Sequence, residues 1–423
     1  MVLDKLKKKI NETNAVSHRY LTALDIGTEV AKVLIAQVVG DEIQIIGVGR
    51  QQQKLGDMHN GAIADIAGVV ENCEKALSQA EAQAGIDAKD VIIGIAGELV
   101  KGTTTTITYK RPDGQAPLEV AELEAIMDQV QERAFERAKT QLAWESGNPD
   151  LEVRLINSAI VSMHIDGYRV NNPIGFQGKD VAIQLYTAFA PMIHIGALER
   201  TAGELDLELV AVAAEPFAVT RTVTPGDANT TFSAILIDVG GGTTDIAVVN
   251  EGGVEGTKMF GIGGRSYTHT ISQELSVDYQ EAEKIKLRAS KGELSGENKQ
   301  NVELAIGKTL DVWESGVAMA LEEFDTLDHL PHNVLLCGGG SSLTQLVDKL
   351  KDANWTDGLP FTKKPNVKHI QPSEVIGIID KTGDVNDHTL VTAMGLLRVG
   401  LDTQITAGDD DSIREKMHKM LRI

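Results

Sequence analysis

One pattern occurs twice in this chain and restricts its fold more than any other feature. An apolar strand ends at Asp25, a glycine turn follows, and a second apolar strand continues, in LTALDIGTEVAKVLIAQVV. The same order returns around Asp238, in FSAILIDVGGGTTDIAVVN. Short apolar runs that end in glycine or charge indicate neighbouring strands. We interpret the repetition as an internal duplication, which predicts two similar α/β lobes that face each other.

Composition narrows the class of protein further. The 423 residues carry a formal net charge of −21, which argues against nucleic-acid binding through the general surface. With 42% hydrophobic residues the chain can bury large cores, so disorder is excluded for most of it. The two cysteines, Cys73 and Cys337, lack metal-ligand spacing and suit a reducing cytoplasm. No apolar run approaches the roughly 20 residues of a membrane span, so we expect a soluble, cytoplasmic protein.

The paired turns are candidates for binding phosphate. Glycine lets the backbone approach a ligand, exposed N–H groups face phosphate oxygens, and threonine hydroxyls add donors. The acidic residue at each strand end can hold hydrated Mg²⁺ through water, and Lys32 can neutralise a phosphate. The alternative is a pair of ordinary tight hairpins. We favour nucleotide binding because both turns occur in matching contexts, with these residues: Asp25, Gly27, Thr28, Lys32, Asp238, Gly240, Gly241, Gly242, Thr243 and Thr244.

Two further segments extend the candidate site. The first is a glycine cluster at a strand end before a helix whose first turn is Ser-Ser, where a flat ligand such as adenine can lie against the backbone: Gly338, Gly339, Gly340 and Ser341. The second combines a glycine pair, Gly263 and Gly264, with a helical run that contains Glu283 and Lys286. Residues three apart share a helix face. This acid–base pair is either a surface ion pair or a contact to ribose hydroxyls.

The order of these motifs resembles the actin-like ATPase superfamily. The residues that carry the resemblance are DIGT, DVGGGTTD, GIGG, AEKIK and CGGGSSL, over residues 20 to about 400. Within that superfamily, the segment MHIDGYRVNNPIGFQGKDVAI and the helix MGLLRVG are similar to the FtsA family of bacterial cell-division proteins. The resemblance implies an actin-like α/β fold, ribonuclease H-like and duplicated, with two lobes and an inserted α/β subdomain.

The resemblance also implies roles and a division of the chain. It places Mg²⁺–ATP between the lobes, with both hairpins on the phosphates, Asp25 and Asp238 at the metal, Glu283 and Lys286 at the ribose, and Gly338–Ser341 at the adenosine. The expected segments are a basic N-terminal segment (1–19), the first lobe (20–99 and 179–231), the inserted subdomain (100–178), the second lobe (232–265 and 330–405), its helical subdomain (266–329), and an acidic linker with a basic helix (406–423).

Glu215 departs from the expected FtsA pattern. The run Ala214-Glu215-Pro216-Phe217 resembles the Glu-Pro of chaperones and MreB proteins, in which the glutamate positions the attacking water, and it is also similar to PilM. A carboxylate near the γ-phosphate can orient or deprotonate water. Alternatively, Glu215 only stabilises the N-terminus of the following helix. The sequence therefore leaves ATP hydrolysis open, with Glu215 and Asp238 as the candidate catalytic residues and weak ATPase activity at most.

The basic ends suggest contact with a membrane. In SIREKMHKMLRI, the apolar residues Ile413, Met417, Met420 and Leu421 form one stripe, with basic residues largely off it. A basic amphipathic helix after an acidic linker favours an anchor for an anionic membrane surface. The alternative is a terminal helix docked on its own domain. Residues 1–10 could form a second basic turn, although a frayed start is the interpretation we rank first.

Three functions follow from these patterns. The one we favour is an ATP-binding protein that polymerises and tethers the cytoplasmic division ring to the inner membrane surface. The FtsA resemblance implies its partners, which are the C-terminal peptide of FtsZ, bound on the second lobe, and other proteins of the division machinery (the divisome). The second is a PilM-like adaptor of type IV pilus assembly, which Glu-Pro-Phe favours and NPIGFQG opposes. The third is a small-molecule kinase of the same superfamily, for which we find no convincing catalytic Asp near a sugar pocket.

Overall fold

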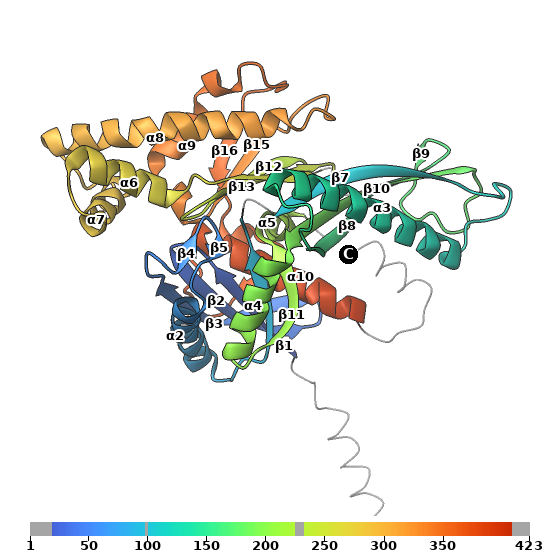
Figure 1. Ribbon diagram of the computed structural model, residues 1–423, viewed down its shortest axis with the longest axis horizontal. Helices are drawn as coiled ribbons and strands as arrows, with labels where there is room; N and C mark the ends of the chain where they lie inside the picture. Colours follow the sequence, from blue (N-terminus) through green and yellow to red (C-terminus); the bar gives the residue numbers. More distant parts are fainter. Residues whose placement is uncertain (1–18, 98–99, 225–231, 408–423) are drawn as a thin grey trace, which may run out of the picture.

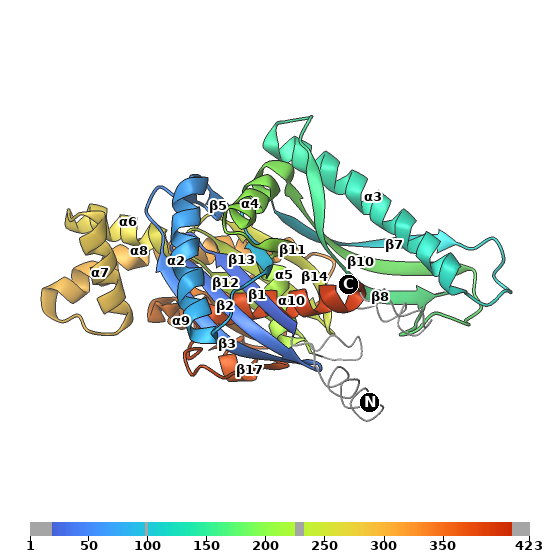
Figure 2. The same cartoon turned by 90° about the horizontal axis from the view of Figure 1, so that it is seen from below.

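The computed structural model describes residues 19–97, 100–224 and 232–407. It shows two α/β lobes and an extension that projects to one side (Figures 1 and 2). The first lobe is built on a six-stranded sheet and the second on a nine-stranded sheet. The expected two-lobed α/β architecture is therefore present.

The sheet of the first lobe has the spatial order β11-β6-β1-β2-β3-β17. Pairs β1–β2 and β2–β3 are antiparallel, whereas β6, β11 and β17 join in parallel. Helices cover both faces, which explains why its central strands are almost continuously apolar. The strands are β1 (Arg19–Ile26), β2 (Val30–Val39), β3 (Glu42–Gln52), β6 (Asp90–Ile95), β11 (Glu208–Ala214) and β17 (Ile378–Asp380), and a short ribbon of β4 (Met58–His59) and β5 (Ala62–Ile63) lies beside them.

Two pairs of helices cover this sheet. Helices α2 and α4 pack on one face, while α5 and α10 pack on the other face and share a core with the second lobe. In Figure 1, α5 and α10 lie between the two sheets. Helix α2 begins at Ile66, because the Asp65 carboxylate caps the amides of Ala67 and Gly68. The helices are α2 (Ile66–Ala84), α4 (Met192–Glu204), α5 (Glu215–Val223) and α10 (Val391–Ala407).

The sheet of the second lobe has the order β16-β15-β12-β13-β14-β7-β10-β8-β9. Its first part repeats the first lobe, because β12 and β13 form the same antiparallel hairpin as β1 and β2. The strands of this part are β12 (Ala234–Val239), β13 (Thr244–Asn250), β14 (Gly253–Phe260), β15 (Asn333–Cys337) and β16 (Asn366–His369). The helices beside it are α6 (Gly264–Leu275), α7 (Tyr279–Ser290), α8 (Gly296–Glu322) and α9 (Thr344–Lys351).

Helix α8 contributes most to the core of the second lobe. Its apolar side chains form a buried stripe: Ile306, Leu310, Trp313, Val317, Leu321 and the following Phe324. The helix has 27 residues and begins at Gly296. Four short 3₁₀ turns complete the described secondary structure: η1 (Gly339–Ser342), η2 (Ala353–Thr356), η3 (Pro372–Glu374) and η4 (His388–Leu390).

The inserted subdomain joins the second lobe, although the chain enters and leaves it from the first. Strand β7 pairs with β14 through Gly102 and Thr103, opposite Thr257 and Gly256. The insertion comprises β7 (Lys101–Lys110), α3 (Val120–Ser146), β8 (Val153–Ile165), β9 (Tyr168–Arg169) and β10 (Asp180–Pro191). The expected boundary at residue 178 is too early, because β10 pairs along its length with β7 and β8. Helix α3 covers one face of this sheet (Figure 2).

A second difference concerns the glycine cluster after β15. We expected a helix whose first turn is Ser341-Ser342, but these residues belong to η1, and α9 begins only at Thr344. The Ser341 hydroxyl donates to the Gly338 carbonyl at 2.7 Å and tightens this turn. The cluster is therefore a compact 3₁₀ turn between strand and helix.

The basic segments at both ends, residues 1–18 and 408–423, lie outside the described residues, so the expected membrane anchor stays a prediction from sequence. Among the residues that the structure describes, no helix is both long and apolar enough to cross a membrane.

Candidate functional site

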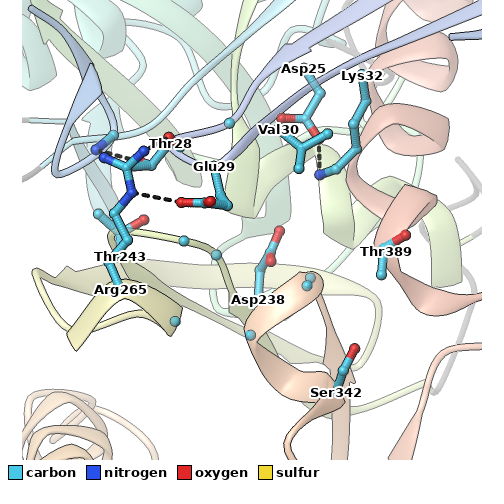
Figure 3. Close-up of a pocket in the computed structure, with 18 of the residues that line it drawn as sticks. Asp25, Thr28, Glu29, Val30, Lys32, Asp238, Thr243, Arg265, Ser342 and Thr389 are labelled. Atoms are coloured by element: carbon cyan, nitrogen blue, oxygen red, sulfur yellow. Dashed lines mark hydrogen bonds and ion pairs between the residues drawn. The ribbon is translucent and has the colours of Figure 1, made fainter. Parts of the chain in front are cut away.

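Two equivalent hairpins place acidic side chains at one cavity. Asp25 lies opposite Lys32 in the β1–β2 pair, and Asp238 lies opposite Asp245 in the β12–β13 pair. Strands β1 and β12 lie in different sheets, and the turns that follow them contact each other between the lobes. Asp25 and Asp238 both line a cavity of about 440 Å³. Figure 3 shows the two carboxylates reaching toward the same opening.

Most of the predicted site residues line this cavity: Asp25, Gly27, Thr28, Lys32, Glu215, Asp238, Gly240, Gly241, Thr243, Gly264, Glu283, Lys286, Gly338, Gly339 and Gly340. They come from both lobes and from elements far apart in the chain. The structure thus brings together the hairpins, the acid–base pair on α7 and the glycine turn after β15.

Four predicted residues do not line the cavity. The Thr244 hydroxyl donates to the Ile262 carbonyl at 2.7 Å and accepts from the Trp313 indole at 2.9 Å, so it serves the core. The Ser341 hydroxyl is likewise used inside its own turn. The other two are glycines at contacts between loops, Gly263 beside the Gly240 carbonyl and Gly242 beside Thr28. These four residues hold the site together instead of facing its interior.

Gly338 shows why the turn after β15 requires glycine. Its φ of +80° lies in the left-handed region, and a Cβ atom there would be 2.0 Å from Asp238 Oδ1. The turn can therefore approach the second hairpin closely. By contrast, a Cβ on Gly339 would meet no protein atom within 4 Å, and Gly339 lines the cavity.

Four carboxyl groups, those of Asp25, Glu215, Asp238 and Asp245, line the cavity together with the ammonium group of Lys32. Lys32 Nζ lies 2.8 Å from Asp25 Oδ2. Burial lowers the pKa of this lysine, but the charge and hydrogen bond of Asp25, together with the charges of Asp238 and Glu215, outweigh burial and raise it. Burial raises the pKa of the Glu215 carboxyl well above its usual value, and the charges of Asp25, Asp245 and Asp238 raise it further. The carboxyl groups therefore outnumber the positive charge among them.

Asp238 and Asp245 have raised pKa values for the same reason. Burial raises the pKa of Asp238, against the effect of a hydrogen bond from Thr392. Burial and the charge of Asp238 raise the pKa of Asp245 to about 8. Asp245 Oδ1 is buried without a hydrogen-bond partner. A divalent cation near these carboxylates would favour their ionised forms.

The donor set fits a magnesium–nucleotide complex better than a bare metal ion. Among the described residues, no group of three or more His, Cys, Asp or Glu side chains is arranged to hold a metal on its own. Mg²⁺ in phosphate sites keeps several waters and takes only one or two carboxylates. Asp25 and Asp238 suit that role, and the hairpin backbone leaves room beside them for phosphate oxygens.

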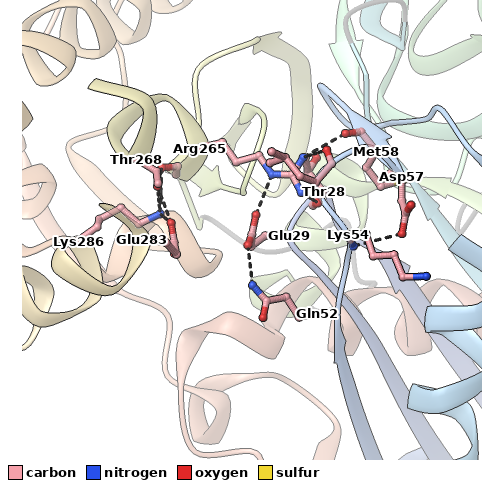
Figure 4. A network of polar contacts seen from close by, with 12 residues as sticks. Thr28, Glu29, Gln52, Lys54, Asp57, Met58, Arg265, Thr268, Glu283 and Lys286 are labelled. Atoms are coloured by element: carbon pink, nitrogen blue, oxygen red, sulfur yellow. Dashed lines mark hydrogen bonds and ion pairs between the residues drawn. The ribbon is translucent and has the colours of Figure 1, made fainter. Parts of the chain in front are cut away.

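The acid–base pair on α7 is part of a partly buried network. Lys286 Nζ lies 2.7 Å from Glu283 Oε2, and their side chains are only 10% and 15% exposed. Lys286 also donates to the Gly264 carbonyl at 3.0 Å, and the Thr268 hydroxyl donates to Glu283 (Figure 4). An ordinary surface ion pair is far more exposed. The pair is therefore fixed at the edge of the cavity.

Sequence reasoning missed several residues that line the cavity, including Glu29, Gln52, Asp245, Arg265 and Thr389. Arg265 is the most notable, because its Nε donates to Glu29 Oε2 at 2.7 Å across the two lobes (Figure 3). It follows the glycine pair Gly263-Gly264 directly, and that position was the one available signal. Nothing in the local pattern indicates its partner, which lies 236 residues away in the chain.

Among known proteins, the chain is similar in sequence to bacterial cell division proteins. The family model described as "Cell division protein FtsA" matches residues 235–395. A cell division protein FtsA from Streptococcus pneumoniae is 29% identical over 350 residues, covering 78% of this chain and 72% of that protein. Another from Pseudomonas aeruginosa is 23% identical over 412 residues, covering 92% and 91%. The expected resemblance to the FtsA family is confirmed.

The FtsA match includes much of the site described above. Residues 235–395 contain the second hairpin, Arg265, the pair Glu283–Lys286 and the turn at Gly338–Gly340, whereas the first hairpin lies outside that span. Among solved structures, the PilM–PilN type IV pilus biogenesis complex aligns with a TM-score of 0.65 at 17% identity, over 90% of this chain and 98% of that chain. This similarity concerns the fold alone, and the expected actin-like fold is confirmed.

Proposed function

We propose that this FtsA-type protein binds ATP with Mg²⁺ between its lobes and acts in bacterial cell division. The observation that supports ATP binding is that Asp25 and Asp238, at the ends of equivalent strands, line one cavity. The duplicated hairpins contribute backbone donors from both sides, as a polyphosphate requires. Similarity to proteins named for cell division supports the cellular role.

In this proposal each part of the cavity binds a different part of the nucleotide. The two hairpins, with Thr28 and Thr243, hold the β- and γ-phosphates, and Lys32 neutralises phosphate charge. Asp25 and Asp238 hold hydrated Mg²⁺, which supplies charge stabilisation at the phosphate oxygens. The network of Glu283 and Lys286 takes the ribose. The turn at Gly338–Gly340 takes the adenosine.

Glu215 is the residue we propose for activating water. It is the first residue of α5, and the residue before it, Ala214, forms no side-chain cap. Its carboxyl group lines the cavity beside Asp25 and Asp238. Burial, followed by the charges of Asp25, Asp245 and Asp238, raises its pKa, which is the direction that makes a carboxylate a stronger base toward water. Glu215→Gln should keep ATP binding and slow hydrolysis, as measured by phosphate release in single turnover.

The cellular proposal is that ATP-bound protomers polymerise and tether the FtsZ ring to the cytoplasmic face of the cell membrane. Closure around the nucleotide would favour one protomer shape and so favour assembly. The basic amphipathic residues 412–423 support a membrane contact. A single short anchor of this kind binds weakly, but many anchors on one filament act together.

Two experiments test the cellular proposal. Liposomes containing anionic lipid should co-sediment the full chain with ATP, and should sediment a chain ending at Gly408 much less. Purified FtsZ should then be recruited to those liposomes only with the full chain. Equal sedimentation of both chains would remove the membrane anchor, and absence of FtsZ recruitment would remove the tether.

A further inference from the structure

The tips of the two hairpins contact each other directly. A Cβ atom on Gly241 would lie 2.9 Å from the Glu29 Cβ, and one on Gly242 would lie 2.8 Å from the Thr28 hydroxyl. Such distances leave no space for a side chain. The glycines of the second hairpin therefore permit the lobes to close on each other, besides leaving room for a ligand.

From the second lobe, Arg265 donates four hydrogen bonds across this contact. Its Nε donates to Glu29 Oε2 at 2.7 Å and its Nη2 to the Thr28 carbonyl at 2.6 Å. Its Nη1 donates to the carbonyls of Met58 and Leu55, at 3.1 and 3.2 Å. All four acceptors belong to the first lobe, and Figure 4 shows Arg265 pointing toward Glu29, Thr28 and Met58. The side chain is only 12% exposed, so these charge-assisted contacts are poorly screened by solvent.

Both ends of this link are fixed in place. The backbone N–H of Arg265 donates to the Gly241 carbonyl at 2.7 Å, so the residue is tied to the tip of the second hairpin. On the other side, Gln52 donates to Glu29 Oε1 at 3.1 Å and orients that carboxylate. Arg265 thus bridges the two hairpins without a mobile intermediate.

The loop that accepts the other two bonds is held by a buried polar cluster. Asn72 Nδ2 donates to Asp57 Oδ2 and to Gln53 Oε1, each at 2.7 Å. The Asp57 carboxylate also accepts from the backbone N–H of Lys54 at 3.2 Å, so the cluster holds the loop that contains Leu55 and Met58. Because the loop is already ordered, Arg265 gains these bonds at little cost in conformational entropy.

The nucleoside side of the cavity is directly connected to this link. Lys286 donates to the carbonyl of Gly264, which immediately precedes Arg265. A nucleoside that contacts Glu283 and Lys286 would therefore engage a network one peptide bond away from the residue that bridges the lobes. Occupation of the cavity and closure of the lobes are physically linked at this point.

We propose that Arg265 is a positioning residue that locks the lobes together over the nucleotide and sets how long the nucleotide stays bound. This inference rests on the proposed ATP binding. Arg265 acts through Glu29, Thr28 and the loop at residues 55–58. Breaking the link removes bonds that hold the closed state. We therefore expect it to change mainly the rate of nucleotide release and to have less effect on the rate of nucleotide entry.

The test is the dissociation rate of a preloaded fluorescent ATP analogue with Mg²⁺, chased by excess ATP. Arg265→Ala should speed release roughly fivefold or more, the lower end of a typical coupling between sites. Glu29→Gln should speed release less, because the carbonyl bonds remain. The double variant, Arg265→Ala with Glu29→Gln, should release the analogue at the same rate as Arg265→Ala alone. Arg265→Lys should release it at a rate between those of the unaltered chain and Arg265→Ala. The control Arg169→Ala breaks an exposed ion pair with Glu251 elsewhere and should change nothing.

A second variant approaches the same contact sterically. Gly242→Ala places a methyl group against Thr28 and should also speed release, although it removes no charge.

Hydrogen exchange of the nucleotide-free chain gives a readout that needs no ATP: Arg265→Ala should raise exchange in residues 53–61. Unchanged release and unchanged exchange in Arg265→Ala would overturn the inference. If the unaltered chain binds no ATP, the proposed function fails, while exchange still decides whether Arg265 holds the lobes closed.

Discussion

At the scale of single residues, the site depends on glycines that have different tasks. Gly338 needs its left-handed backbone and its closeness to Asp238, so it is required for folding of the turn. Gly339, the next residue, has free space where a side chain would begin. The two neighbours therefore separate the stability of the turn from the binding of a ligand.

This difference predicts opposite outcomes for two alanine substitutions. Gly338→Ala should lower the free energy of unfolding by about 2 kcal/mol or more, through backbone strain and overlap with Asp238. Gly339→Ala should change it by less than about 0.5 kcal/mol, yet weaken ATP binding because the methyl group enters the cavity. Chemical denaturation and ATP titration measure the two effects. Equal stability of both variants would contradict this assignment.

The buried carboxyl of Asp245 predicts a dependence on pH. The pKa of Asp245 is about 8 in the folded chain, against its ordinary value of 3.8. At pH values between these two, the folded chain therefore holds more protons at this position than the unfolded chain. The contribution of Asp245 to the free energy of unfolding therefore falls as pH rises from about 4 to about 8. Asp245→Asn should remove this loss.

The nucleotide-free Asp245→Asn variant should be more stable than the unaltered chain at pH 8, by about 1 kcal/mol or more. The advantage should shrink toward pH 5. Urea denaturation at both pH values measures the difference between the two proteins. A difference that is the same at pH 5 and pH 8 would mean that Asp245 is ionised throughout.

At the scale of secondary-structure elements, the pairing of β7 with β14 decides where the insertion is attached. The Tyr186 hydroxyl lies 3.3 Å from the Thr257 hydroxyl, and a Cβ on Gly102 would lie 2.1 Å from Thr257 Oγ1 and 2.3 Å from Tyr186 Oη. The strands can approach only because residue 102 has no side chain. Tyr186 also stacks on Phe217 of α5, with ring centroids 5.4 Å apart.

Substitution at this junction should loosen the insertion. Gly102→Ala should lower the free energy of unfolding by about 2 kcal/mol and raise hydrogen exchange in residues 101–104 and 253–257. Tyr186→Phe alone should cost about 1 kcal/mol. Because Tyr186→Phe removes one of the clashing atoms, the double variant should lose less than the sum of the two. Additive losses with unchanged exchange would show that the junction is not tightly packed.

The elements also show which features the sequence could predict. Both hairpins and the buried stripe of α8 follow from local patterns of apolar residues and glycine, so they were predictable. The β7–β14 pair joins residues more than 150 positions apart, and no local signal encodes it. The same applies to Arg265 and Glu29. Thr244 was misassigned because its neighbour Trp313, which turns the hydroxyl inward, is also distant in sequence.

At the scale of the whole molecule, the two lobes are joined by a shared core as well as by the residues around the cavity. Helix α5 packs against both sheets, and α10 packs against the first sheet and against α5, so movement of one lobe is transmitted through a shared core. The insertion extends the sheet of the second lobe, so closure would also move this projecting part. In the proposed function, nucleotide binding and lobe closure would therefore also set the shape that the chain offers to a second copy of itself.

The most direct test is calorimetric titration of ATP with Mg²⁺ into the unaltered chain, Asp25→Asn, Asp238→Asn and Asp238→Ala. One nucleotide should bind per unaltered chain. Asp238→Ala should abolish binding, and each Asn variant should weaken it by about tenfold or more, because in the proposed function both lobes hold the same magnesium–phosphate group. Thermal unfolding of each variant confirms that it is folded. Unchanged affinity in a folded Asp238→Ala variant would contradict the account.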